Sequence, residues 1–458
     1  MKLIHSTIRA AGGLIAGLAL LVGQSFGAQI ALKAAVSKPI LPAGQKHLTH
    51  LKVGLTGFEM QREKARVPVN LTIVLDRSGS MSGEKIAQAR EAACLAVRSL
   101  APTDIVSIVT FEGGVEILVP ATKASDQASI CKKIEGIVPG GGTALFAGVS
   151  KGAEEMRKFL SKESVNRVIL LSDGQANVGP ASPGELAELG SSLIKEGISV
   201  TTIGLGTGYN EDLMTRLAEK SDGRHAFVES PKQLAQIFQD EIGNVNAVVA
   251  QKIRINILCD PGVKPVRVIG REATIAGQKV TLDLNQIYSK EEKYLVLEME
   301  VPEGSVGLTR DLARVEVSYD NLSTHEPEKL TNTVAVRFSN NPEEIEKAVN
   351  KDVMVAAVTQ IAVFNNGLAI ELRDQGKIQE AKQTLLSNYA WTAENAGKLN
   401  SPELKTIADL NNQDAQNIEK NWEENRKIMK DTAYQQRYSQ GVEVEKSLQR
   451  RAPLPAKK

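Results

Sequence analysis

The chain has 458 residues, of which 42% are apolar and 24% charged, a composition typical of globular proteins and not of disordered ones. Its length is enough for about two to four domains. The 55 basic and 54 acidic residues give a net charge of +1, which excludes bulk electrostatic attraction to nucleic acid or to an anionic membrane as the basis of function. Partners are therefore expected at local sites.

Residues 1–27 have the pattern of a secretory signal peptide. Lys2 and Arg9 make the start basic, residues 10–22 form an uncharged apolar core, and small residues precede a cleavage site after Gly27. The core is shorter than the roughly 20 residues of a membrane span, although an uncleaved N-terminal anchor stays an alternative. No other stretch is expected to cross a bilayer. We therefore expect a secreted or periplasmic protein with no membrane insertion after signal removal.

Two segments, 28–66 and 246–340, show the alternation of strands, punctuated by Gly and Pro, and lack helical periodicity. They are expected to form the two parts of one small β-sandwich, although composition alone does not show that the parts pair. The clearest strands predicted in the second part are 252–258, 293–299, 313–319 and 333–338.

Between these flanks, residues 67–245 alternate short apolar runs with amphipathic segments of helix length, which predicts an α/β domain with a central, mostly parallel sheet. Ligands of such sheets gather at the carboxyl ends of the strands. The predicted strands are 69–75, 105–111, 168–171, 200–205 and 226–228. The predicted helices are 85–100, 128–137, 145–159, 183–195, 212–220 and 233–245.

Five oxygen-bearing side chains follow predicted strand ends or lie in a glycine loop. Asp76, Ser78 and Ser80 occupy DRSGS directly after the first strand, Thr143 lies in PGGGTAL, and Asp173 lies in VILLSDGQAN. Carboxylate and hydroxyl oxygens suit Mg²⁺, Mn²⁺ or Ca²⁺ better than zinc or copper. The sequence therefore predicts one divalent metal site, with Mg²⁺ favoured.

This ordered set resembles the metal-ion-dependent adhesion site (MIDAS) of von Willebrand factor type A domains, which is Asp-x-Ser-x-Ser, then Thr in a glycine-rich loop, then Asp. The flanking SGSMSG and LLSDG are most similar to the bacterial branch that is like the inter-alpha-trypsin inhibitors and chloride-channel regulators. The resemblance implies a Rossmann-like domain inserted between the two halves of a β-sandwich. It also implies a cation held directly by Ser78, Ser80 and Thr143, with the aspartates partly water-mediated, that binds an exposed Asp or Glu of a partner protein.

Residues 341–438 are predicted to be helical, with helices at 343–372, 378–397 and 402–431, and we interpret them as a helical hairpin packed on the rest of the protein. The tail, 439–458, is basic and rich in Pro and is expected to be disordered.

Three cysteines, Cys94, Cys131 and Cys259, are too few and too scattered for a disulfide framework and have no metal-ligand spacing. Cys94 and Cys131 both fall on predicted helices. They are either buried apolar side chains, which is the favoured interpretation, or a pair that forms a disulfide in an oxidising compartment.

No catalytic site is predicted. The five histidines are scattered, and the chain has neither a phosphate-binding P-loop nor the H-E-x-x-H zinc motif. We expect a metal-dependent protein-binding or adhesion module and not an enzyme. The alternative is a cell-envelope scaffold or assembly factor that binds through its helical or β regions, and a metal-dependent hydrolase is disfavoured because the site lacks a nearby general base.

Overall fold

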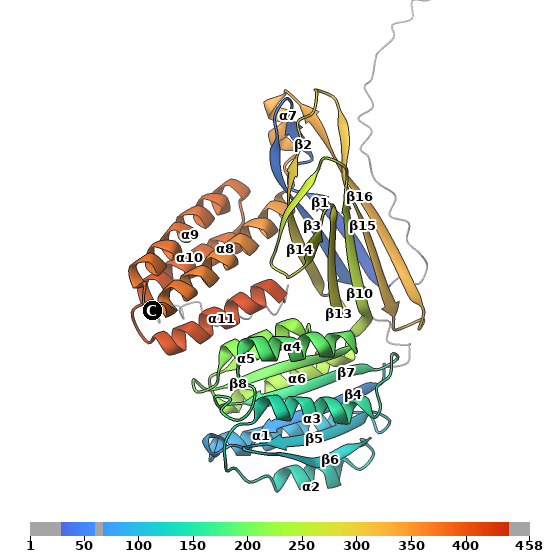
Figure 1. The fold of residues 1–458 in the computed structure, drawn as a ribbon, viewed down its shortest axis with the longest axis vertical. Helices are drawn as coiled ribbons and strands as arrows, with labels where there is room; N and C mark the ends of the chain where they lie inside the picture. The colour runs from blue at the N-terminus through green and yellow to red at the C-terminus, as the bar shows by residue number, and fades with distance from the viewer. Residues whose placement is uncertain (1–28, 60–66, 439–458) are drawn as a thin grey trace, which may run out of the picture.

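The computed structural model describes residues 29–59 and 67–438, so the predicted signal peptide and C-terminal tail lie outside the described residues. Figure 1 shows three units: an α/β domain at the bottom of the view, a β-sandwich above it, and a helical module beside both. The α/β domain is inserted between the third and the later strands of the sandwich.

The sandwich consists of two sheets with a shared apolar core. One sheet has the order β1-β3-β14-β11 and the other β12-β13-β10-β15-β16-β2. Strand β3, before the insertion, pairs along nearly its whole length with β14, after it, so the two segments form one unit. The strands are β1 (Ile30–Val36), β2 (Ile40–Pro42), β3 (His47–Gly57), β10 (Val248–Cys259), β11 (Lys264–Ile269), β12 (Thr274–Ala276), β13 (Lys279–Tyr288), β14 (Glu292–Val301), β15 (Thr309–Asn321) and β16 (Pro327–Ser339).

The α/β domain has a six-stranded sheet of order β6-β5-β4-β7-β8-β9, parallel except for the edge strand β6. Every residue of β4, β7 and β8 is buried, as expected for parallel strands covered on both faces. The five predicted strands are confirmed, but β6 was missed. The strands are β4 (Val69–Asp76), β5 (Ile105–Phe111), β6 (Val115–Lys123), β7 (Val165–Ser172), β8 (Ile198–Leu205) and β9 (His225–Val228).

Helices cover both faces of this sheet. One apolar core lies under α1 (Glu84–Arg98), α2 (Gln127–Glu135) and α6 (Leu234–Asn246). The opposite core lies under α3 (Leu145–Arg157), α4 (Pro183–Lys195) and α5 (Glu211–Lys220). All six predicted helices are confirmed to within a few residues. Because the strands other than β6 are parallel, their carboxyl ends meet at one edge of the sheet, as expected.

The helical module is larger than the predicted hairpin. After the short α7 (Pro342–Lys347) it consists of α8 (Lys351–Asp374), α9 (Ile378–Leu399), α10 (Pro402–Asn417) and α11 (Trp422–Tyr438). Asn350 caps α8 through Val353 N, which divides the first predicted helix, and the third is divided before α11. α8 packs against the outer face of the β3-β14 sheet, whereas α11 contacts the α/β domain at α5 and β9.

α8 also corrects one expectation about membranes. It is long and apolar enough to cross a bilayer by length and composition, with a mean hydropathy of 1.7 in its most apolar window, although the sequence suggested that no such stretch followed the N-terminus. About half of that window (56%) is buried inside the protein against the other helices and the sandwich.

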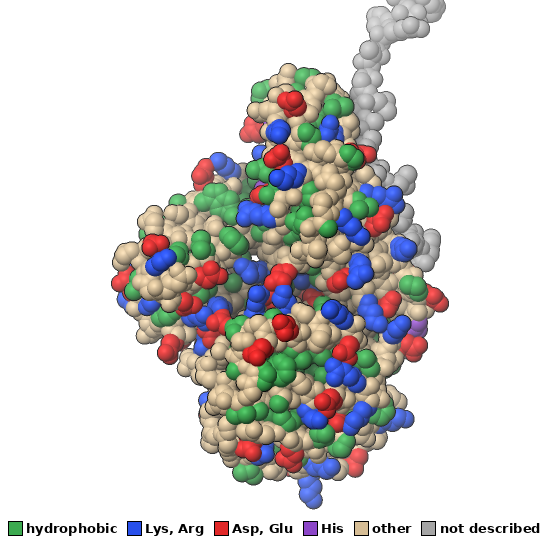
Figure 2. Space-filling model, in the orientation of Figure 1, with side chains coloured by type: hydrophobic (Ala, Val, Ile, Leu, Met, Phe, Trp, Pro, Cys, Tyr) green, Lys and Arg blue, Asp and Glu red, His purple; other side chains and the backbone are tan. Residues whose placement is uncertain are grey.

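The three units meet at a charged junction, and Figure 2 shows basic and acidic side chains gathered along this line. Arg167 of β7, fully buried, pairs with Glu241 of α6 at 3.2 Å. Its second terminal nitrogen, Nη2, donates to Gln286 and to Tyr288 of the sandwich, both at 2.5 Å. Arg167 therefore links two units through a buried charge with partners on both sides.

Asp222 is a second buried charge at the junction. It follows α5 with a φ of 48°, and it accepts from Lys293 Nζ at 2.9 Å, from Arg271 at 3.5 Å and from Asn285 N at 2.7 Å. Burial alone would raise the pKa of Asp222, but the two cations and the hydrogen bonds outweigh burial and hold the pKa below its usual value.

Cys94 of α1 and Cys131 of α2 face each other as free thiols. The sulfur of Cys94 lies 3.7 Å from the Cys131 carbonyl oxygen, and the sulfur of Cys131 lies 3.8 Å from the Cys94 carbonyl oxygen. Burial and the neighbouring thiol raise the pKa of Cys94 to about 12, which keeps the thiol protonated. The favoured interpretation, buried thiols, agrees with this packing.

Replacing Arg167 with Met should lower the free energy of unfolding by about 3–5 kcal/mol, because Glu241 would be left buried without its charged partner. Urea denaturation would measure the loss. The control is Arg254→Met, which removes an exposed pair with Asp283 and should cost less than about 1 kcal/mol. Equal effects of the two substitutions would contradict the role assigned to Arg167.

Acid should weaken the junction through Asp222. Because its folded pKa is depressed, its contribution is fully present above the unfolded pKa of about 4 and is lost as the pH falls below that value. Asp222→Asn, which tolerates the positive φ, should therefore flatten the fall in urea midpoint below about pH 4. The exposed Asp283→Asn should leave the pH profile unchanged, and an unaltered profile in Asp222→Asn would count against this assignment.

Candidate metal centre

The first part of the site is built by the end of β4 and the turn that follows. The buried run of β4 ends at Asp76, and the carboxylate of Asp76 accepts from the backbone N–H of Ser78 at 2.8 Å, which closes a tight turn. The turn leads into the short helix η1 (Gly79–Met81), and Ser78 Oγ and Ser80 Oγ lie 3.0 Å apart. Three predicted ligands thus come from one turn at the carboxyl edge of the sheet.

The glycine loop places Thr143 beside that turn. Gly140 N donates to Arg77 O at 2.7 Å, and Gly79 N donates to Gly141 O at 3.3 Å. Gly141 has a φ of +73°, which strains any other residue, and a Cβ there would also displace the Glu112 carboxylate, 2.0 Å away. Thr143 is held through its backbone N–H, which donates to the side-chain oxygen of Asn177 at 2.8 Å.

The third part follows β7. Ser80 Oγ donates to Asp173 Oδ1 at 2.7 Å, and Ser172 Oγ donates to Asp76 Oδ2 at 2.5 Å. The two loops are therefore cross-linked by side chains from neighbouring parallel strands, as expected at the carboxyl ends of β4 and β7.

The space beside Gly174 shows that these oxygens converge. The position that a Cβ would occupy lies 3.2 Å from Thr143 Oγ1 and 3.6 Å from both Asp76 Oδ2 and Ser80 Oγ. Gly174 leaves this space open next to three of the predicted ligand atoms. The structure thus brings all five predicted residues into one cluster, and none lies elsewhere in the fold.

Burial makes the negative charges of the two carboxylates in this cluster unfavourable. Asp76 and Asp173 are 0% and 1% exposed, whereas Ser80 is exposed to solvent. Burial raises the pKa of the Asp76 carboxyl, and the negative charge of Asp173 raises it further, against hydrogen bonds from Ser172 and Ser78 that lower it. A cation would relieve both effects.

Lys85, in the first turn of α1, supplies one positive charge to the cluster. Its ammonium group forms an ion pair with Asp173 Oδ2, while the other oxygen of Asp173 accepts from Ser80. The lysine is half-buried, so its flexible stem can withdraw toward solvent. A divalent cation at this site would either share Asp173 with Lys85 or displace the Lys85 ammonium group from Asp173.

The donor set fits a hard divalent cation. Asp76 and Asp173 would supply negative charge to the ion. Ser78, Ser80 and Thr143 would add neutral hydroxyl oxygens. Such oxygen donors suit Mg²⁺, Mn²⁺ or Ca²⁺. Within residues 29–59 and 67–438, no group of three or more His, Cys, Asp or Glu side chains could hold a metal ion. The mixed hydroxyl and carboxylate cluster is therefore the candidate centre.

Sequence reasoning found the five oxygen donors but missed the residues that orient them. Ser172 and Asn177 hold Asp76 and Thr143 in place, and Lys85 pairs with Asp173. Ser172 could have been noticed because it directly precedes Asp173 at a strand end. Asn177 gave no signal, because its contact depends on how two loops distant in sequence approach each other.

Comparison with known proteins agrees with this geometry. Residues 70–240 match the family model of the von Willebrand factor type A domain. The chain therefore carries a von Willebrand factor type A domain between the two halves of its sandwich. Domains of this type generally mediate protein–protein interaction or adhesion, often with a divalent metal ion.

Curated relatives share this domain at low identity. Uncharacterized protein YfbK of Escherichia coli (strain K12) is 28% identical over 227 residues, which cover 49% of this chain and 39% of YfbK. Uncharacterized protein sll0103 of Synechocystis is 24% identical over 343 residues, or 72% of this chain and 79% of sll0103. Human inter-alpha-trypsin inhibitor heavy chain H3 is 28% identical over 236 residues, or 48% of this chain and 26% of the heavy chain. The expected likeness to the inter-alpha-trypsin inhibitors is confirmed.

The likeness in fold extends beyond the domain itself. A von Willebrand factor type A protein from Catenulispora acidiphila has a TM-score of 0.66 at 16% identity, covering 84% of this chain and 91% of that structure. Most of this fold is thus shared with a solved structure.

Replacing Lys85 with Met should tighten divalent cation binding several-fold, because the metal would no longer compete with, or be repelled by, an ammonium group at Asp173. Titration calorimetry with Mg²⁺ and Mn²⁺ would measure the change. Lys151→Met, which removes an exposed lysine paired with Glu154, is the control and should leave the affinity unaltered. Weaker binding by the Lys85 variant would show that Lys85 supports the metal instead of competing with it.

Proposed function

We propose that this chain is an exported, metal-dependent protein-binding module that captures a carboxylate of a partner protein through a divalent cation, with Mg²⁺ favoured. The observation that carries the proposal is the convergence of five hard oxygen donors at the carboxyl edge of the sheet, with Ser80 open to solvent. The bound cation would supply an electrophilic centre for the partner's Asp or Glu. The apolar N-terminal segment supports export to the periplasm or the medium.

The rim of the site also supports a protein ligand. Val138, at the start of the glycine loop, is 68% exposed, and Val178, which packs against Gly142, is 38% exposed. Large apolar side chains exposed beside a polar centre favour contact with a macromolecule over a free ion alone. Arg77 is paired with Glu112 at 3.3 Å. The partner's carboxylate would therefore bind the metal ion and not Arg77.

Catalysis is not part of the proposal. The domain contains one histidine, His225, and burial lowers its pKa to about 3, so it stays neutral. Its ring nitrogens contact Thr202 and Tyr209, and it lies at the start of β9, outside the predicted ligand loops. Glu112, which contacts the glycine loop, is held by Arg77. Neither group is placed as a free general base.

A scaffold function is the second candidate, and a groove in the helical module favours it. The groove lies between α8 and α9, has a volume of about 610 Å³ and is lined by Asn365, Gln383, Asn388 and Trp391 among others. Phe364 and Leu368 of α8 are 51% and 43% exposed. A partner held here would bind without a metal ion.

The test is a pull-down from cell-envelope extract with the mature protein in Mg²⁺ or in EDTA. We expect a partner that is retained in Mg²⁺ only, and that is lost with Asp76→Asn and with Thr143→Val. Both substitutions keep the side-chain shape, and the amide oxygen introduced by Asp76→Asn can still accept the hydrogen bond from Ser78 N, so both variants should fold. Their metal affinity should fall by more than the roughly 10–100-fold typical of losing an outer-shell partner.

The control is Asp283→Asn, an exposed aspartate of the sandwich, which should retain the partner. Retention in EDTA by every variant would contradict the metal-dependent function. Loss of that retention on Trp391→Ala would then assign binding to the helical groove.

A further inference from the structure

The segment Gly208–Asp212, which comprises the end of the β8–α5 connection and the first two residues of α5, lies against the predicted metal loop. Gln175 Nε2, two residues after Asp173, donates to Gly208 O at 2.8 Å. A Cβ on Gly208 would lie only 2.8 Å from the backbone oxygen of Asp173, so the two backbones are in direct contact. A shift of Gly208 would therefore displace the backbone of Asp173, one of the predicted ligands.

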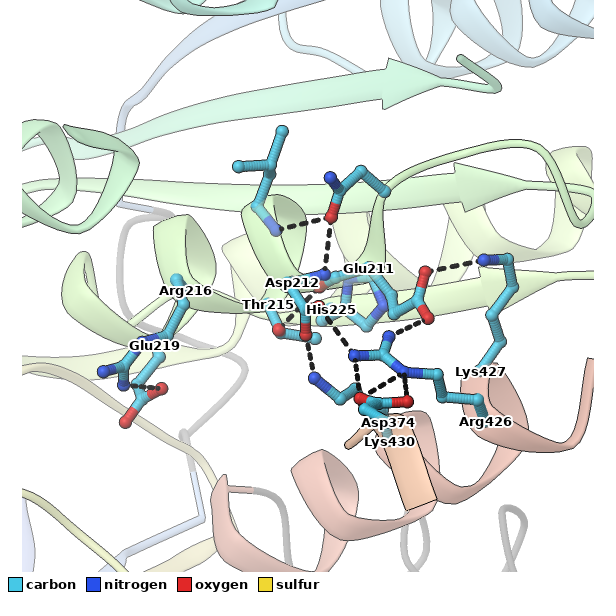
Figure 3. A network of polar contacts seen from close by, with 12 residues as sticks. Glu211, Asp212, Thr215, Arg216, Glu219, His225, Asp374, Arg426, Lys427 and Lys430 are labelled. Carbon is cyan, nitrogen blue, oxygen red and sulfur yellow. Dashed lines mark hydrogen bonds and ion pairs between the residues drawn. The ribbon is translucent and has the colours of Figure 1, made fainter. Parts of the chain in front are cut away.

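The other side of the same segment is held by α11 of the helical module. Lys427 Nζ donates to Tyr209 O at 3.0 Å and pairs with Glu211 Oε2 at 2.6 Å. Arg426 pairs with Glu211, with Asp212 at 2.8 Å and with Asp374 of α8 at 2.8 Å. Figure 3 shows these side chains reaching from α11 to the start of α5.

The contacts of Lys427 are buried, which makes them strong constraints on position. Lys427 and Glu211 are each 5% exposed, and Tyr209 is completely buried. The ammonium of Lys427 also lies 5.0 Å from the centre of the Tyr209 ring. A buried lysine that loses its partners leaves an uncompensated charge, so α11 and the segment must keep their relative place.

Tyr209 transmits that constraint to the sheet. A Cβ on Gly204, in β8, would lie 2.3 Å from the Tyr209 ring, which shows how tightly the ring packs on the strand beside β7. Asn210 caps α5 by accepting from Asp212 N at 3.0 Å and Leu213 N at 3.2 Å. The segment is thus fixed at both ends and has little freedom to absorb a movement of α11.

We propose that Lys427 is a positioning residue for the metal site: through Tyr209 and Gly208 the helical module sets the place of the Asp173 loop, and so the affinity for the divalent cation. This inference rests on the proposed function, because it assumes that the site binds metal. By linkage, metal binding must in turn stabilise the docked position of α11 by the same free energy.

The first measurement is the affinity of the full mature chain for Mn²⁺ by titration calorimetry. Lys427→Met should weaken binding by about fivefold or more, the lower range for coupled sites. The matched control is Tyr434→Phe, which removes a hydrogen bond of 3.0 Å from α11 to Gly223, beyond the far end of α5, and should leave the affinity within about twofold of wild type.

The second measurement is hydrogen exchange of the α11 amides with and without Mn²⁺. In the wild type, metal should slow exchange in α11, and Gln175→Ala, an exposed residue that links the metal loop to Gly208, should abolish that slowing while α11 stays docked. This variant keeps the question testable even if Lys427→Met fails to fold.

The outcomes separate the two proposals. A wild type that binds no divalent cation overturns the proposed function and this inference with it. A wild type that binds Mn²⁺, with affinity unchanged in a folded Lys427→Met and no metal effect on α11 exchange, leaves the proposed function intact and overturns the inference alone.

Discussion

Charge that is buried away from water has to be compensated inside the protein, and this constraint shapes every junction of the structure. Arg167, whose charge Glu241 compensates, ties the von Willebrand factor type A domain to the sandwich through Gln286 and Tyr288. Asp222 makes a second tie with Lys293 and Arg271. At the candidate metal centre the same constraint is met only in part. Asp76 and Asp173 are two buried carboxylates, and one half-buried lysine pairs with Asp173. The remaining excess of negative charge is one that a divalent cation would neutralise.

The same physics explains where the sequence was a good guide and where it failed. Strand β5 was predicted at its observed bounds because its apolar run stands between polar turns. β7 was predicted too short, since Asn166 and Arg167 look like surface residues, yet both are buried by partners that come from elsewhere in the chain. β6 was missed because it is an edge strand, largely open to solvent, without a continuous apolar pattern.

The candidate metal centre was predictable at the level of its oxygen donors, because each follows a strand end or lies in a glycine loop. Its tuning was not. Lys85, Ser172 and Asn177 act through contacts that depend on the approach of separate loops, and no local pattern encodes such an approach. The helical module shows the same limit. Its helices could be located from their periodicity, but the docking of α11 on Glu211 is a match of charges more than 200 residues apart in sequence.

The insertion of the domain within the sandwich has a mechanical consequence. The chain enters the domain after β3, in one sheet of the sandwich, and leaves it through β10, in the other sheet. A tensile load on a partner held at the carboxyl edge would therefore divide between two covalent tethers anchored in different sheets. Each tether ends in a central strand with neighbours on both sides, so the load acts along strands that can yield only by shearing whole ladders of hydrogen bonds.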